Sequence, residues 1–213
     1  MKTSDIIVKY IPVSAIYIML WLNRKRFNAV GERMGDIFSK LPLTPNQWTV
    51  MSLLLAVIVF YLIFIGSFLL ASLLFIITMS IDMIDGAVAR KTRNVTRIGG
   101  YLDSVIDRAV EFLIILGLFM TPYPAMVLPA SIWLIFLLFG SFMSTYTRAA
   151  AFEKLSFKDV KGGILEHTDR LVFLLIILLV SSFSLLYASY LISIMAVLAF
   201  ASFLQRFFGA IKR

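Results

Sequence analysis

The sequence predicts an all-α polytopic membrane protein with six transmembrane helices and an N-terminal amphipathic interfacial helix. Two features of composition support this prediction: 61% of the 213 residues are apolar, and the mean hydropathy is +0.94. Six apolar runs are each long enough to cross the hydrocarbon core of a bilayer as a helix. They cover residues 46–65, 68–90, 98–120, 126–148, 168–186 and 190–207.

The distribution of positive charge is the third observation. The predicted turns at 66–67, 121–125 and 187–189 contain no Lys or Arg, whereas 90–97 and 148–161 are basic. Because basic connections stay on the cytoplasmic side, this alternation predicts the orientation of the helices. The formal charge of +8 is thus explained by the membrane, without a nucleic-acid partner. The chain has no cysteine, which excludes disulfides and thiolate metal sites.

The N-terminal part, residues 1–45, is predicted to be an interfacial segment that precedes a transmembrane domain of residues 46–213. Residues 5–22 are apolar but are interrupted by Lys9 and Pro12, so we expect them to lie in the interface, with an extra span as the alternative. An amphipathic helix is predicted next, because apolar residues recur at helical spacing. They are Phe27, Val30, Met34, Ile37, Phe38 and Leu41.

Four aspartates at the cytoplasmic ends of the second and third predicted spans are candidate metal ligands. Asp82 and Asp85 stand three residues apart, and Asp103 and Asp107 four apart, so each pair shares one face of a helix. Carboxylates at such close quarters repel one another unless cations neutralise them. Hard oxygen ligands favour Mg²⁺, Mn²⁺ or Ca²⁺ over zinc or copper.

The segment that holds these aspartates resembles the signature of the CDP-alcohol phosphotransferase family. It reads D-x-x-D-G-x-x-A-R, eight residues, then G-x-x-x-D-x-x-x-D. Every fixed position is filled, by Asp82, Asp85, Gly86, Ala89, Arg90, Gly99, Asp103 and Asp107. The resemblance implies transfer of a phosphoalcohol from a cytidine diphosphate donor to an acceptor hydroxyl, with release of CMP.

The resemblance also implies roles for individual residues. One or two Mg²⁺ or Mn²⁺ ions would be held by Asp82, Asp85, Asp103 and Asp107, and Asp107 would be the catalytic base. Residues 44–49 and 96–99 are similar to family segments that contact the donor. The CDP group would be bound by Asn46, Thr49, Asp85, Gly86, Ala89, Arg90, Thr96 and Gly99.

Members that make phosphatidylinositol phosphate or archaetidylinositol phosphate carry two further patterns. They are matched here by Tyr146, Arg148, Ala149, Glu166, Asp169, Arg170 and Leu171. Arg148 and Arg170 are therefore candidate contacts for the phosphate of an acceptor. Arg206, at the end of the last predicted helix, is a third candidate, with an interfacial anchor as the alternative. His167 and Thr168 depart from the usual bacterial residues, and His167 is interpreted as a polar residue at a helix start.

The resemblance leaves the substrates open. The donor is CDP-diacylglycerol, CDP-archaeol or, because Asn23-Arg24-Lys25 resembles the di-myo-inositol-phosphate phosphate synthases, CDP-inositol. Inositol phosphate is the favoured acceptor, with glycerol phosphate or serine as the alternatives, and a homodimer is compatible with the pattern. A cation or proton transporter would explain the aspartates, but not Gly86, Ala89 and Arg90 at their spacing. Arg108 is predicted to pair with Glu111 at i+3 in a structural role.

Overall fold

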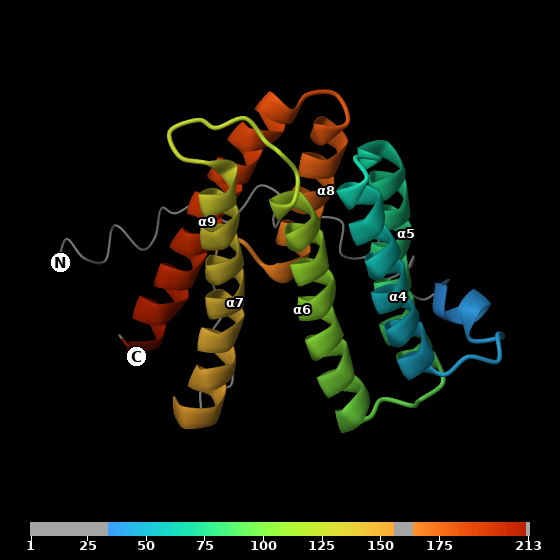
Figure 1. The fold of residues 1–213 in the computed structure, drawn as a ribbon. Coiled ribbons are helices and arrows are strands. Elements are labelled where there is room, and N and C mark those ends of the chain that lie inside the picture. The colour runs from blue at the N-terminus through green and yellow to red at the C-terminus, as the bar shows by residue number, and fades with distance from the viewer. Residues whose placement is uncertain (1–33, 156–163, 212–213) are drawn as a thin grey trace, which may run out of the picture.

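The computed structural model describes residues 34–155 and 164–211, and within these ranges every regular element is a helix. The prediction of an all-α protein is therefore confirmed for the described part of the chain. Residues 5–22 and the beginning of the predicted amphipathic helix lie outside it. The helices are α4 (Pro45–Phe64), α5 (Phe68–Lys91), α6 (Arg97–Phe119), α7 (Ala130–Leu155), α8 (His167–Ser181) and α9 (Leu185–Ile211) (Figure 1).

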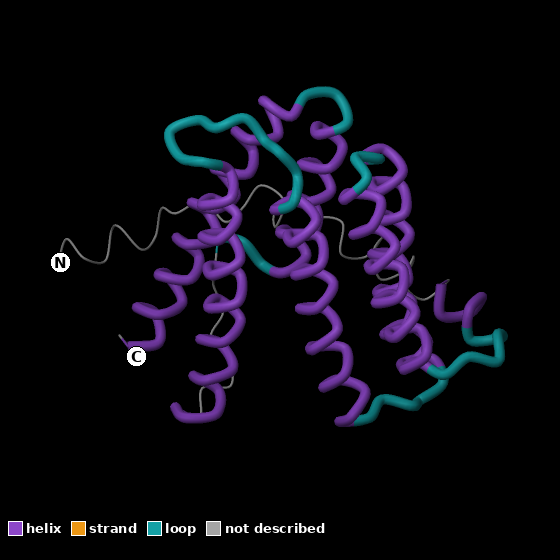
Figure 2. The backbone as a smooth tube through the Cα atoms, viewed as in Figure 1, coloured by secondary structure: helices purple, strands orange, loops and turns teal. Residues whose placement is uncertain are grey.

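The helices run up and down, with α4 and α5 on one side, α7 and α9 on the other, and α6 and α8 between them (Figure 1). The connections at 65–67, 120–129 and 182–184 lie at one end of the bundle, and the turn at 92–96 lies at the opposite end (Figure 2). A continuous core of buried apolar side chains draws on all six helices. The turns with no basic residue and the basic turn are thus separated by the length of the bundle.

Local sequence explains how α4 begins and how it turns into α5. Gln47 closes a capping box at the start of α4, where its Oε1 accepts a hydrogen bond from the backbone nitrogen of Thr44 at 2.8 Å. Pro45 occupies the first turn, where no backbone donor is needed. After α4, Gly66 adopts a φ of +80°, a conformation that favours glycine. The predicted turn at Gly66-Ser67 is confirmed.

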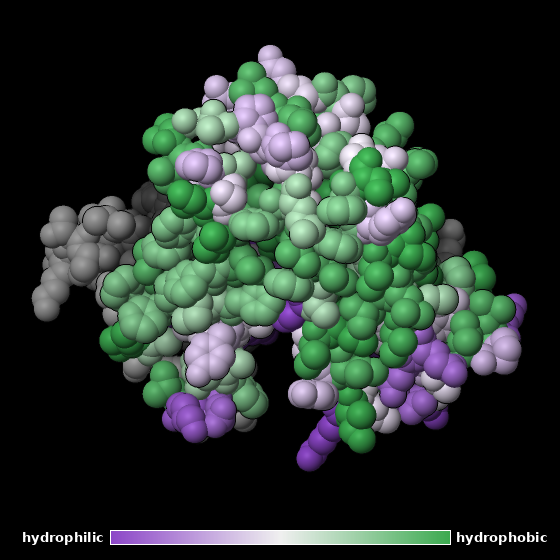
Figure 3. Space-filling view, in the orientation of Figure 1, coloured by the Kyte–Doolittle hydropathy of each residue, from purple (hydrophilic) through white to green (hydrophobic). Residues whose placement is uncertain are grey.

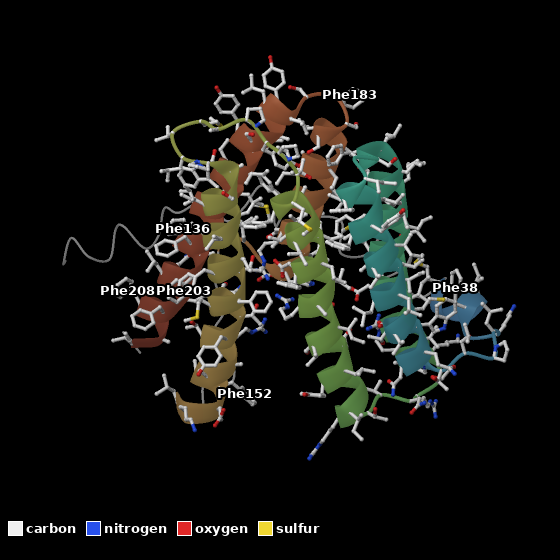
Figure 4. All side chains as sticks on the ribbon, viewed as in Figure 1. Phe38, Phe136, Phe152, Phe183, Phe203 and Phe208 are labelled. Carbon is white, nitrogen blue, oxygen red and sulfur yellow. The ribbon has the colours of Figure 1, made fainter. Side chains whose placement is uncertain are left out.

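The α7–α9 pair is held by a close backbone approach and by aromatic side chains. A Cβ atom built on Gly140 would lie 2.8 Å from the carbonyl carbon of Ala199, so only glycine permits this crossing. Phe200 of α9 makes ring contacts with Phe136 and Phe139 of α7, with centroids 6.1 and 6.2 Å apart. Figure 4 shows Phe136 on the outer side of this pair.

The predicted boundaries of the last two helices were wrong. The turn lies at 182–184 instead of 187–189, and α8 has 15 residues where a span of 168–186 was predicted. Hydropathy alone could not locate this turn because the sequence is nearly continuously apolar across it. The hydroxyl of Ser182 marks it instead, by donating to the carbonyl of Leu179 at 2.6 Å. Similarly, α7 begins at Ala130 and continues to Leu155, not from 126 to 148.

Four helices, α4, α5, α7 and α9, are long and apolar enough to cross a membrane. The six-span prediction is thus supported for these four. Helix α6 has enough residues but carries four charged side chains in its middle, and α8 is short. Most of the outer surface in view is hydrophobic, and hydrophilic residues gather at the lower end of the bundle (Figure 3).

The described remainder of the amphipathic helix, residues 34–38, packs against the lower ends of α4 and α5. Phe38 makes an edge-to-face contact with Trp48, with ring centroids 5.5 Å apart, and Asp36 forms an ion pair with Lys91. Ile37, which the pattern placed on the apolar face, is 62% exposed. The contacts of this segment with α5 make it one wall of the cleft described below.

Candidate active site

Three of the four predicted aspartates form a tight carboxylate cluster between α5 and α6. Asp82, Asp85 and Asp103 each offer an oxygen atom, and these atoms lie within 4.8 Å of one another. The two helices are joined by the short turn at 92–96, which brings the face of each acid pair toward the other. Three hard oxygen donors at this separation fit a divalent cation such as Mg²⁺ or Mn²⁺.

Asp107 lies one turn further along α6. Its Oδ2 atom is 3.4 Å from Nε2 of His167 and 3.6 Å from Nη2 of Arg108. The fourth aspartate is therefore next to the carboxylate cluster and also in contact with basic side chains. This setting distinguishes it from the other three acids.

A pocket of about 190 Å³ borders the carboxylate cluster on the side of α4. We call it the glycine pocket, after Gly86, Gly99 and Gly100 in its wall. All eight residues predicted to bind the CDP group line this pocket. They are Asn46, Thr49, Asp85, Gly86, Ala89, Arg90, Thr96 and Gly99.

Small residues and hydroxyl groups shape the glycine pocket. Thr49 donates a hydrogen bond of 2.6 Å to Oδ2 of Asp85, which orients a carboxylate that is only 5% exposed. A Cβ atom on Gly99 would lie 3.0 Å from Oγ1 of Thr96, the group that caps α6. A Cβ atom on Gly86 would lie 3.3 Å from Nη1 of Arg90. The two glycines therefore leave room for these polar side chains at the wall.

A second pocket, of about 270 Å³, lies between α6, α7, α8 and α9. We call it the arginine pocket because Arg108, Arg148, Arg170 and Arg206 line it. The structure thus brings together the three arginines predicted for an acceptor phosphate, from three different helices. Figure 3 shows a hollow between the lower ends of α6 and α7, with hydrophilic residues inside.

Glu111 holds two of these arginines in place. It is completely buried, and its oxygens accept hydrogen bonds from Nε of Arg170 at 2.6 Å and from Nη1 of Arg108 at 3.1 Å. The predicted i+3 pair of Arg108 and Glu111 is confirmed. Arg206 is anchored separately, by donating to the carbonyl of Ser144 at 3.1 Å. The guanidinium groups of Arg108, Arg170 and Arg206 are therefore oriented by protein contacts.

The acid pair at the start of α8 has a local structural role. The backbone nitrogen of Glu166 donates to Oδ2 of Asp169 at 3.0 Å, which closes a capping box. Helix α8 begins partway along the bundle (Figure 1), and residues 166–168 at its amino end line the arginine pocket. The carboxylates of Glu166 and Asp169 offset the partial positive charge at the amino end of α8, so the positive charge of this pocket comes from its arginines.

A larger cleft of about 1050 Å³ joins the two pockets. Its lining includes Asp82, Asp85, Asp103, Asp107 and His167. Asp85 also lines the glycine pocket, and Asp107 also lines the arginine pocket. The carboxylates therefore lie where the two pockets meet.

Sequence reasoning missed three contributors to this site. Arg108 was assigned a structural role only, yet it lines the arginine pocket. His167 begins α8 as interpreted, but its ring also enters the cleft beside Asp107. Glu111 was predicted to pair with Arg108 but was not predicted to be part of the site. The signal that could have found it is a carboxylate four residues after Asp107 on the same helix face, inside an apolar run.

Similarities to known proteins agree with this geometry. Residues 42–206 match the family model described as CDP-alcohol phosphatidyltransferase. The archaetidylinositol phosphate synthase of Pyrococcus horikoshii is 32% identical over 184 residues, which cover 85% of this chain and 91% of that protein.

Solved structures of the phosphatidylinositol phosphate synthase of Mycobacterium tuberculosis, 24% identical, share the fold. One, with CDP-DAG bound, superposes with a TM-score of 0.74 over 85% of this chain and 94% of that one. Another, in complex with manganese and citrate, gives a TM-score of 0.75 over 85% and 88%.

Proposed function

The chain belongs to the CDP-alcohol phosphatidyltransferase family, and from this premise we propose that it joins a CDP-activated lipid to inositol phosphate. The reaction type follows from the family, so the substrates are what the proposal adds. The observation that carries it is the arginine pocket, in which four guanidinium groups surround a space that ends at Asp107. A site that already serves a diphosphate donor needs this extra positive charge only if a second anion binds.

The donor group is assigned to the glycine pocket. Arg90 offers a fork of donors for phosphate oxygens, and Gly86 lets a ligand approach the backbone of α5 closely. A lipid donor is favoured over CDP-inositol because α4 and α5, whose residues line this pocket, are both long and apolar enough to cross a membrane. A donor with acyl or isoprenoid chains can reach such a site from the bilayer. The Pyrococcus relative is named as a synthase of an inositol phosphate lipid, which supports the same pairing.

A divalent metal is expected at Asp82, Asp85 and Asp103, with Asp107 as the predicted fourth ligand. Their oxygens have the chemistry and the separation that Mg²⁺ or Mn²⁺ requires. When bound, such an ion neutralises the donor diphosphate and the charge that develops during transfer.

In the proposed reaction, Asp107 accepts the proton of the acceptor hydroxyl while the hydroxyl oxygen bonds to the lipid-linked phosphorus of the donor. The bond from that phosphorus to the bridging diphosphate oxygen breaks, and CMP leaves with the electron pair. Arg108, Arg148, Arg170 and Arg206 hold the acceptor phosphate, which directs a hydroxyl group at Asp107. Transfer of a phosphoryl group depends mostly on this alignment and on charge neutralisation.

The active site is proposed to face the cytoplasm. Arg90, Lys91, Arg93 and Arg97 surround the turn next to the carboxylates, whereas the connections at the other end of the bundle contain no Lys or Arg. By the positive-inside rule, the basic end is cytoplasmic. Water-soluble inositol phosphate would then enter from the cytoplasm, and the lipid donor from the membrane.

The test is a panel of acceptors offered to the purified protein with CDP-diacylglycerol or CDP-archaeol, with release of CMP as the readout. We expect inositol phosphate to react fastest, ahead of glycerol phosphate, serine and free inositol. Serine or unphosphorylated inositol as the best acceptor would contradict the proposed acceptor class.

The same assay tests the metal. EDTA should abolish the release of CMP, and Mg²⁺ or Mn²⁺ should restore it, because the three clustered carboxylates repel the donor diphosphate when no cation is present. Full turnover in the chelator would refute a metal-dependent reaction.

A further inference from the structure

His167 lies between two carboxylates of α6. Its Nε2 atom is 3.4 Å from Oδ2 of Asp107, and its Nδ1 atom is 3.4 Å from Oε2 of Glu111. Asp107 and Glu111 stand four residues apart and therefore share one face of α6. The imidazole ring bridges the two acids from the first position of α8.

Both ring nitrogens are shielded from solvent. Within the described ranges, neither has a hydrogen-bond partner, and the carboxylates of Asp107 and Glu111 face them at 3.4 Å. Because buried polar atoms are normally satisfied, two unpaired ring nitrogens between two carboxylates indicate contacts that form fully when the site is occupied. Contacts of this length at a catalytic site often tighten once substrate is bound.

Of the two carboxylates that face His167, Glu111 is held more firmly than Asp107. Glu111 is completely buried and accepts hydrogen bonds from Arg170 at 2.6 Å and 3.2 Å. Asp107 lines the open cleft, where its carboxyl group also contacts Asp82 of the carboxylate cluster. The ring therefore connects a fully buried carboxylate to one at the edge of the cleft.

We propose that His167 is a positioning residue, whose Nε2 atom holds the Asp107 carboxylate where the acceptor hydroxyl arrives. The inference rests on the proposed function, in which Asp107 accepts the proton of that hydroxyl. Arg108 also approaches Oδ2 of Asp107, at 3.6 Å, so two contacts on one oxygen set the orientation of the carboxyl group. Misplacing a reacting group by about 1 Å can lower the rate about a hundredfold.

Two amide substitutions at position 167 distinguish the contact with Asp107 from the contact with Glu111. In His167→Gln the side-chain nitrogen can occupy the place of Nε2 and keep the contact with Asp107. In His167→Asn the nitrogen reaches only the place of Nδ1, beside Glu111. We expect His167→Gln to keep most of the wild-type kcat and His167→Asn to lose about tenfold to a hundredfold. The KM values for donor and acceptor should be the same in both variants.

A double variant tests whether His167 acts through Asp107. In an Asp107→Asn background, His167→Asn should lower kcat no further, because residues that act as a unit are not additive. Equal kcat in the Gln and Asn single variants, a change confined to the acceptor KM, or loss of folding in both would overturn the positioning role. If the wild-type protein released no CMP from a CDP-lipid, the proposed function itself would fail, which is a different result.

Discussion

Asp107 lies where the arginine pocket meets the larger cleft, and its role can be tested by replacing one oxygen atom of its carboxyl group. Asp107→Asn preserves the shape of the side chain but cannot accept the proton of the acceptor hydroxyl. We expect kcat to fall about 10²–10⁴-fold, as is typical for loss of a general base, while the CDP donor still binds.

Rates of CMP release and equilibrium binding of the donor measure these two effects separately. Asp82→Asn is the comparison, since it removes a carboxylate from the cluster of three and should weaken binding of Mn²⁺. Near-normal turnover by Asp107→Asn would show that another group accepts the proton.

Arg148 provides the cleanest test of the arginine pocket at the residue scale. Arg170 is unsuitable because it forms a buried ion pair with Glu111, and breaking such a pair typically destabilises a protein by about 3–5 kcal/mol. Arg148 is exposed and lines the same pocket. A charge-assisted contact to phosphate contributes about 1.5–3 kcal/mol, so Arg148→Ala should raise the acceptor KM about tenfold or more.

Arg97→Ala is the matched control for Arg148→Ala. Arg97 is an exposed arginine at the same end of the bundle, and it is not part of the arginine pocket. Its loss removes the same charge and should leave the acceptor KM unchanged. Equal KM values for the two variants would identify Arg148 as an anchor at the membrane surface.

At the scale of elements, the turn between α5 and α6 determines how the two acid pairs face each other. Arg93 lies in this turn with a φ of +54°, and the backbone nitrogen of Asn94 donates to the carbonyl of Ala89 at 2.9 Å. A left-handed conformation costs a residue with a Cβ atom about 1–2 kcal/mol. Glycine avoids that strain. Its greater conformational entropy in the unfolded chain, however, costs about 0.4–1 kcal/mol of stability.

We therefore expect Arg93→Gly to stabilise the protein by about 0.5–1 kcal/mol. In a chain of this size, each kcal/mol of stability raises the thermal unfolding midpoint by about 2–4 °C, so the midpoint should rise measurably. Arg93→Ala is the control, because it removes the same side chain and keeps the strain. If Arg93→Ala stabilised the protein as much as Arg93→Gly, the backbone argument would be wrong.

At the scale of the whole molecule, the arginine pocket depends on how closely α7 and α9 cross. Gly140 sets this distance, because a Cβ atom there would lie 2.8 Å from both the carbonyl carbon of Ala199 and the nitrogen of Phe200. Gly140→Ala should separate the helices and destabilise the protein by about 1–3 kcal/mol, as overpacking does.

Gly209→Ala in α9 is the control for Gly140→Ala, since a Cβ atom there would meet nothing within 4 Å. Both substitutions gain the same helix propensity, about 1 kcal/mol, so the difference between their unfolding midpoints isolates the clash. The two midpoints should move in opposite directions. A shared upward shift would mean that the crossing of α7 and α9 tolerates a side chain.

Much of this architecture can be predicted from the sequence because its determinants are local. Apolar runs, caps and turn residues located the central residues of the six helices. The spacing of Asp82, Asp85, Asp103 and Asp107 identified the acidic faces of α5 and α6. These patterns depend on the period of a helix and on motif spacing, which are properties of the chain itself. The family and its reaction type were predicted on the same grounds.

The tertiary structure decided which side chains meet. Periodicity along α6 could not place His167, 56 positions beyond Glu111, against that residue, because such a contact depends on how α6 and α8 pack. The same holds for Arg148, Arg170 and Arg206, which come from three helices to one pocket. The length of α8 was also decided in three dimensions, since its capped start partway along the bundle makes room for the pocket, whereas hydropathy alone predicted a full span.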